Sequence, residues 1–144
     1  MKNLLTSFTA LLLFASQSFS HCQIPCGIFG DEDRFTAMLE DVTTIRKSVA
    51  QINELSKSNA PNYNQLVRWV SNKEDHADKI SDTVLKYFLQ QRIKPDQDHY
   101  EDKLVALHKI IVGAMKVKQT SDLEQVDALE ATIKAFHELY THKH

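Results

Sequence analysis

The stretch DEDRFTAMLEDVTTIRKSVAQINEL, residues 31–55, decides the fold because its apolar side chains recur at steps of three and four. The recurring residues are Phe35, Met38, Val42, Ile45, Val49, Ile52 and Leu55. This spacing places them on one face of an α-helix and is typical of a seam between packed helices. Asp31, Glu32 and Asp33 suit the first turn because their negative charges oppose the helix dipole. Residues 31–55 are therefore predicted to form an amphipathic helix.

Three further stripes with helical spacing follow this first one. They consist of Leu66, Val67, Val70, Ala77, Ile80, Val84, Tyr87 and Phe88; of Tyr100, Leu104, Leu107, Ile111, Ala114 and Met115; and of Leu123, Val126, Leu129, Ile133, Phe136 and Tyr140. Ser121 and Glu124 have the spacing of a capping box at the start of the last helix. No segment alternates with a period of two, and the connections are short. The pattern predicts an all-α fold, an antiparallel up-down-up-down four-helix bundle over residues 31–144.

The first twenty residues have the three-part pattern of a secretory signal peptide. Lys2 precedes an apolar run from Leu4 to Ala15, which is too short to cross a bilayer as a helix. Small residues at Ser18 and Ser20 fit the rule for signal peptidase, so we expect residues 1–20 to be removed between Ser20 and His21. The protein is then expected to be exported to the periplasm or the extracellular space.

The remaining 124 residues are enough for a single domain with a modest core. Loss of Lys2 leaves 16 basic and 19 acidic residues, a net charge of about −3 with neutral histidine. A mildly acidic chain lacks the basic footprint of a nucleic-acid-binding protein. No other apolar run has membrane length, so we expect a soluble protein without a membrane anchor.

Residues 21–30, HCQIPCGIFG, stand before the first helix and hold the only two cysteines, Cys22 and Cys26. In an exported protein such a pair is often a disulfide. A loop this small would add little stability to a helical bundle, however, and a disulfide does not explain the position of His21 directly behind the predicted cut.

Cleavage after Ser20 would create a free amine on the residue that also carries an imidazole. Five-membered chelate rings can join this amine to the Cys22 amide nitrogen, and that nitrogen to the Cys22 thiolate, while Cys26 supplies a second thiolate. A planar set of this kind suits Ni(II) or Cu(II) better than Zn, which prefers a tetrahedron. The His21 imidazole is a possible axial ligand. Thiolate and anionic amide donors stabilise a higher oxidation state of the bound metal, which indicates a redox function.

The segment HCQIPCGIF closely resembles the metal hook of the nickel superoxide dismutase family, His-Cys-x-x-Pro-Cys-Gly-x-Tyr at the mature N-terminus. The resemblance implies dismutation of superoxide to oxygen and hydrogen peroxide by Ni(III)/Ni(II) cycling, with one nickel ion per subunit. It implies that His21, Cys22 and Cys26 are both the metal ligands and the catalytic residues. It also implies a homohexamer of four-helix bundles. The chain then divides into a signal peptide (1–20), a nickel hook (21–30) and the bundle (31–144).

Residues around the hook support or depart from this pattern. Pro25 restricts the backbone so that the second sulfur can face the first, and Gly27 allows a tight exit. Phe29 stands where the family has a tyrosine, so a hydroxyl near the metal is missing, and Gln23 replaces a common aspartate. Tyr87 resembles the family's other pocket tyrosine.

The support of the axial imidazole is also expected to differ. In the family a first-helix Glu and a second-helix Arg steady it, whereas the matching regions here hold Met38 and His76. The resemblance therefore predicts support through His76 or Glu40. Basic side chains near the hook could speed the arrival of the superoxide anion. The candidates are Arg34, Arg68 and Lys73.

Two other functions fit the same residues. A non-catalytic extracytoplasmic protein could bind nickel or copper with the same hook, and it would show no turnover. A purely structural helical module with a Cys22–Cys26 disulfide would hold no metal and no free thiol.

Overall fold

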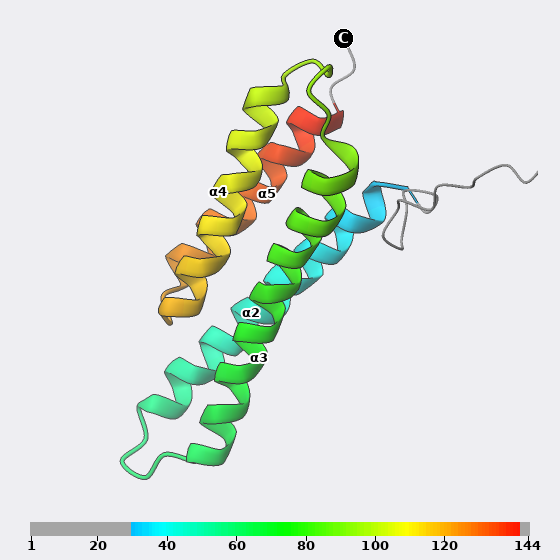
Figure 1. The fold of residues 1–144 in the computed structure, drawn as a ribbon. Coiled ribbons are helices and arrows are strands. Elements are labelled where there is room, and N and C mark those ends of the chain that lie inside the picture. The colour runs from blue at the N-terminus through cyan, green and yellow to red at the C-terminus, as the bar shows by residue number, and fades with distance from the viewer. Residues whose placement is uncertain (1–29, 142–144) are drawn as a thin grey trace, which may run out of the picture.

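The computed structural model describes residues 30–141 and places most of them in long helices, with no strand in that range (Figure 1). The helices are α2 (Glu32–Ser56), α3 (Tyr63–Asp82), the π-helix η1 (Thr83–Arg92), α4 (Tyr100–Gln119) and α5 (Leu123–Thr141). Because η1 continues α3 without a break, the chain forms four rods, and the all-α four-helix bundle is confirmed. Of the predicted hook, residues 21–30, only Gly30 is among the described residues.

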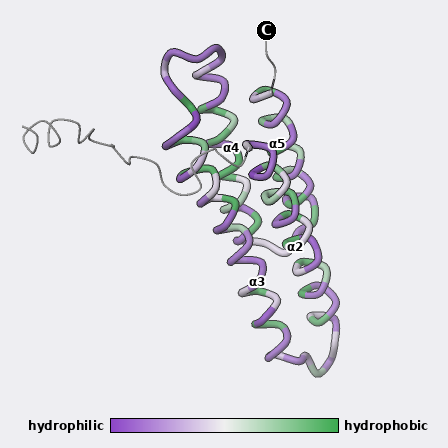
Figure 2. The backbone as a smooth tube through the Cα atoms, turned by 90° about the vertical axis from the view of Figure 1, so that its right-hand side faces the viewer, coloured by the Kyte–Doolittle hydropathy of each residue, from purple (hydrophilic) through white to green (hydrophobic). Residues whose placement is uncertain are grey.

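Each rod packs against two neighbours, so the four form a closed ring around one core. Helix α2 contacts α3 and α5, and α4 contacts the same two helices. Figure 2 shows hydrophobic and hydrophilic positions alternating around each helix, as the stripes in the sequence predict. The seam residues of α2 from Phe35 to Ile52 are all buried, and only Leu55 at its end is partly exposed.

A group of aromatic rings fills the end of the core where α2 begins and α5 ends. Phe88 is fully buried and lies between Phe35 and Phe136, with ring centroids 5.0 and 5.1 Å away. Tyr140 and Tyr87 complete its surroundings, with centroids 5.4 and 5.3 Å from that of Phe88. Rings from α2, η1 and α5 therefore join three rods at this end of the bundle.

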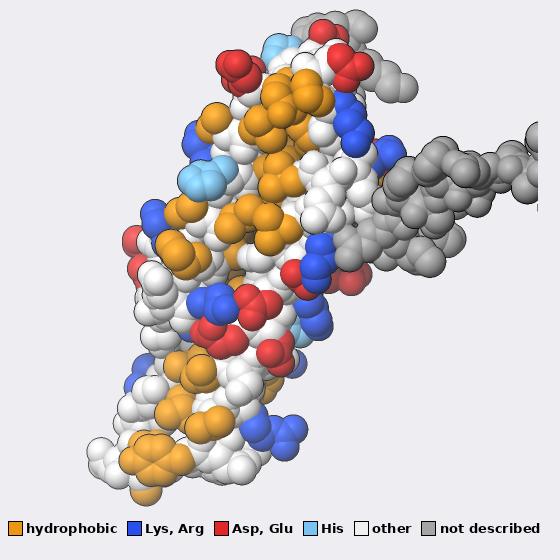
Figure 3. Space-filling view, viewed as in Figure 1, with side chains coloured by type: hydrophobic (Ala, Val, Ile, Leu, Met, Phe, Trp, Pro, Cys, Tyr) orange, Lys and Arg blue, Asp and Glu red, His pale blue; other side chains and the backbone are white. Residues whose placement is uncertain are grey.

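The opposite end differs from the prediction. Val67 and Val70 were expected in the core, but their exposed fractions are 62% and 38%. The cause is length: the α2–α3 hairpin extends past the ends of α4 and α5 (Figure 1), so these positions have no helix facing them. Hydrophobic side chains appear on the surface at this tip in Figure 3.

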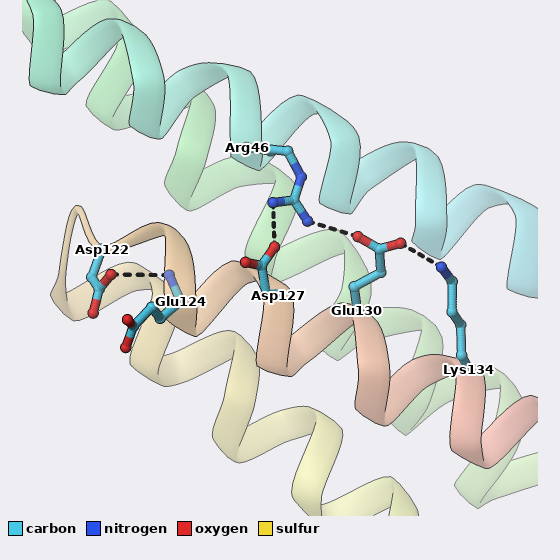
Figure 4. Close-up of polar contacts among 6 residues, drawn as sticks. All are labelled: Arg46, Asp122, Glu124, Asp127, Glu130 and Lys134. Atoms are coloured by element: carbon cyan, nitrogen blue, oxygen red, sulfur yellow. Dashed lines mark hydrogen bonds and ion pairs between the residues drawn. The ribbon is translucent and has the colours of Figure 1, made fainter.

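The start of α5 also differs from the sequence pattern. The backbone N–H of Glu124 donates to Asp122 Oδ1 at 2.9 Å, so Asp122 caps the helix and the predicted capping box with Ser121 is wrong (Figure 4). Farther along α5, Arg46 of α2 binds Asp127 and Glu130, and Glu130 also accepts from Lys134 at 2.6 Å. The contacts of Arg46 link α5 to α2.

Among residues 30–141, no helix is both long enough and apolar enough to cross a membrane.

Candidate functional site

The predicted ligands His21, Cys22 and Cys26 lie outside the described residues, as do Pro25, Gly27 and Phe29. The structure begins at the root of the predicted hook, where Gly30 leads into α2. Gly30 has a φ of 81°, in the left-handed region that favours glycine, so the chain turns sharply at this residue. The next residue, Asp31, is the centre of a polar cluster.

The Asp31 carboxylate accepts hydrogen bonds from three side chains on two distant segments. Arg92 Nη2 at the end of η1 and Tyr140 Oη at the end of α5 each lie 2.7 Å from Oδ2. Tyr87 Oη of η1 donates to Oδ1. The Asp31 side chain is only 19% exposed. One carboxylate therefore joins the start of α2 to the ends of two other rods.

These contacts shift the pKa values of all four groups. Burial alone would raise the pKa of Asp31, but the hydrogen bonds from Arg92, Tyr87 and Tyr140 outweigh it, and the pKa lies below its ordinary value of 3.8. The pKa of Arg92 is raised, chiefly by its hydrogen bond to Asp31. Burial, and then the bond to Asp31, raises the pKa values of Tyr87 and Tyr140 to about 12. At neutral pH the cluster holds an ionised carboxylate, a guanidinium and two neutral phenols.

We expect these two phenols to ionise late in an alkaline titration. A free tyrosine ionises near pH 10, so the unfolded chain loses these protons first. The stabilisation from the neutral phenols is therefore complete below about pH 10 and is lost as the pH rises through about 12. Ultraviolet absorbance of the phenolates measures the step. Tyr140→Phe should remove part of it, whereas Tyr63→Phe, at an exposed tyrosine in the far tip, should leave it unchanged.

Positive and aromatic side chains surround the cluster. The guanidinium carbons of Arg34 and Arg92 lie 5.5 and 5.9 Å from the centre of the Tyr87 ring. The Nε atoms of both arginines are buried, and neither has a hydrogen-bond partner among the described residues. Because Arg92 is ion-paired with Asp31, it is Arg34 that would attract an anion to the root of the predicted hook.

The other predicted support residues lie farther along the bundle. His76 Nδ1 is 2.6 Å from Asp41 Oδ1, and both side chains are mostly buried, so His76 pairs with Asp41 and not with Glu40, which is exposed. Asp41 follows Asp31 by ten residues, about 15 Å along the helix. Met38 is part of the core.

Of the three predicted steering residues, the structure places only Arg34 beside the cluster. Arg68 is exposed near the start of α3, toward the opposite tip. Lys73 is buried, and its Nζ donates to the carbonyl oxygens of Lys118 and Thr120, both at 2.8 Å. Lys73 therefore caps the end of α4, and its charge is not free to attract a substrate.

Sequence reasoning missed most of the Asp31 cluster. Helical spacing predicts Tyr140 in the core stripe of the last helix, and the charge of Asp31 suits the start of a helix, but nothing in the sequence links either residue to Arg92. An acid and a base 61 positions apart carry no local signal of their pairing.

Within residues 30–141, no three His, Cys, Asp or Glu side chains come together in a group that could hold a metal ion.

Comparison with known proteins gives one match. The family model described as nickel-containing superoxide dismutase matches residues 16–144, a range that includes positions 21–27. No curated protein and no solved structure matches the chain.

Proposed function

The chain belongs to the nickel-containing superoxide dismutase family, and from this membership we propose that residues 21–30 are its nickel hook. The protein is a nickel-dependent oxidoreductase with superoxide as its substrate. Two superoxide anions and two protons give one molecule of oxygen and one of hydrogen peroxide. The observation that carries this function is the match over residues 16–144, most of the chain.

The donors in the proposed hook fit nickel by their chemistry. The His21 amine, the Cys22 amide nitrogen and the thiolates of Cys22 and Cys26 would supply two nitrogens and two sulfurs, a donor set that suits nickel. The His21 imidazole would be a further nickel ligand. When bound, nickel supplies the one-electron oxidation and reduction of superoxide by alternating between Ni(III) and Ni(II).

The residues at the root of the hook have separate tasks in this proposal. Arg34 places a positive charge where the superoxide anion would approach. Tyr87 Oη holds its proton toward Asp31, and a pKa of about 12 makes its release unfavourable at neutral pH. Tyr87 is therefore a poor proton source for peroxide, and its role is to bind Asp31. His76, which is held by Asp41, would support the His21 imidazole.

Maturation, location and assembly belong to the same proposal. Signal peptidase cuts between Ser20 and His21, and the mature chain works in the periplasm or outside the cell. The subunits form a homohexamer. Exposed apolar residues on α3, Tyr63 and Val67 among them, offer surface that a subunit contact could cover.

The test is to purify the exported protein, read its N-terminal residue and measure its metal content. We expect His21 at the terminus and one nickel ion per chain, and we expect Cys22→Ser and Cys26→Ser to lose that nickel. His108→Gln is the matched control, because it removes an exposed imidazole on α4. A metal-free protein with a Cys22–Cys26 disulfide would overturn the proposal, and bound nickel without superoxide turnover would indicate a carrier.

A further inference from the structure

We propose that Asp31, Tyr87, Arg92 and Tyr140 form a clamp that holds the root of the nickel hook and fixes its position on the bundle. We refer to these four residues as the Asp31 clamp. The inference rests on the proposed function, because it assigns a positioning role toward the nickel that residues 21–27 would hold.

The first observation is how the Asp31 carboxylate is used. Asp31 occupies the N-cap position of α2, where an aspartate side chain commonly accepts a hydrogen bond from its own helix. Here the side chain makes no such capping bond. Both of its oxygens instead accept from side chains of η1 and α5. The carboxylate therefore holds Gly30 and Asp31 against η1 and α5.

The second observation is the short distance along the chain between the clamp and the proposed ligands. Cys26 precedes Asp31 by five residues. Even a fully extended chain of five residues spans at most about 18 Å, and the sharp turn at Gly30 further restricts its direction. The position of Asp31 therefore limits how far the Cys26 thiolate can lie from the start of α2.

The third observation is that the donors are themselves held in place. Tyr87 is buried, and its ring packs against Phe88 and lies beneath the guanidinium groups of Arg34 and Arg92. The Tyr140 ring lies 5.6 Å from those of Phe35 and Phe136. Because these rings are packed in the aromatic core, their hydroxyl groups hold the Asp31 carboxylate in a fixed position.

The test compares Asp31→Asn with Asp33→Asn in the mature nickel-loaded protein. Both variants remove one negative charge from the same turn, but Asp33 is exposed and its side chain makes no hydrogen bond to a described residue. Changing residues that orient metal ligands lowers metal affinity about 10- to 100-fold, so we expect a loss of that size for Asp31→Asn. It is measured by the rate of nickel transfer to a chelator, together with the thiolate-to-nickel absorption band. Asp33→Asn should match the wild type.

Ile52→Val separates positioning from a general loss of stability. This substitution weakens the core near the far end of α2, away from the clamp. Nickel release should not rise in Ile52→Val. If the rate of nickel release rose in step with the loss of stability across Asp31→Asn, Asp33→Asn and Ile52→Val, the proposed clamp would be wrong.

The outcomes also separate this inference from the proposed function. If the wild type held no nickel, the proposed function would fail. If the wild type held nickel and Asp31→Asn released it at the rate of Asp33→Asn, only the clamp would fail. Should Asp31→Asn not fold, Tyr140→Phe removes one of the three donors and keeps the ring. We expect it to speed nickel release, and an unchanged rate would contradict the clamp.

Discussion

Insertion of one alanine between Ser20 and His21 is expected to leave the bundle folded and to reduce nickel content and superoxide dismutation to background. Signal peptidase needs a small residue at the third position before the cut. If it cut after the inserted alanine, that position would be held by the large Phe19, so cleavage stays after Ser20. The free amine then belongs to the alanine, and the nitrogen of His21 becomes an amide. The five-membered ring from that amine to the Cys22 amide is lost, while residues 30–141 are unchanged.

The measurements are N-terminal sequencing, circular dichroism, nickel content and superoxide decay. The matched control inserts alanine between Asn59 and Ala60, in the exposed loop after α2. This control should keep nickel and activity. Full activity in the Ser20–His21 insertion variant would show that the free amine of His21 is not a ligand.

Phe88→Ala is expected to cause the largest loss of stability. Phe88 is fully buried, and four aromatic rings lie within 5.4 Å of its ring centroid. Removing a buried phenylalanine costs about 3–5 kcal/mol, because the packing is lost and a cavity remains. Domains of this size have unfolding free energies of only about 5–15 kcal/mol, so much of the total would be lost.

Urea denaturation of the metal-free chain measures this cost without interference from nickel binding. Leu85→Ala is the control, because Leu85 lies on the same π-helix and is 43% exposed. Its cost should be about 1 kcal/mol or less. Equal costs for the two substitutions would mean that the aromatic rings do not form the core of the bundle.

The sequence predicted the four rods well because each rod has its own local signal. Apolar residues spaced by three and four along α2 become its buried face, and the breaks near Pro61 and Pro95 fall between rods. The prediction was wrong where burial depends on another element. Val67 and Val70 continue the stripe of α3, but α4 and α5 are too short to cover them.

The candidate site was predictable only in part, for the same reason. His21, Cys22 and Cys26 form a local motif, and the sequence alone suggests their chemistry. The Asp31 cluster depends on contacts between residues 31, 87, 92 and 140, which only the folded bundle brings together. Helical spacing indicates that Tyr140 faces inward, but it does not reveal which carboxylate its hydroxyl binds.

The most direct test of the proposed mechanism is the rate of superoxide decay in the presence of the mature chain beginning at His21. The same preparation is measured before and after it is loaded with nickel. We predict that decay is accelerated only in the loaded sample and in proportion to the nickel bound. Equal decay rates with and without nickel would contradict the assignment of residues 21–30 as a catalytic nickel hook.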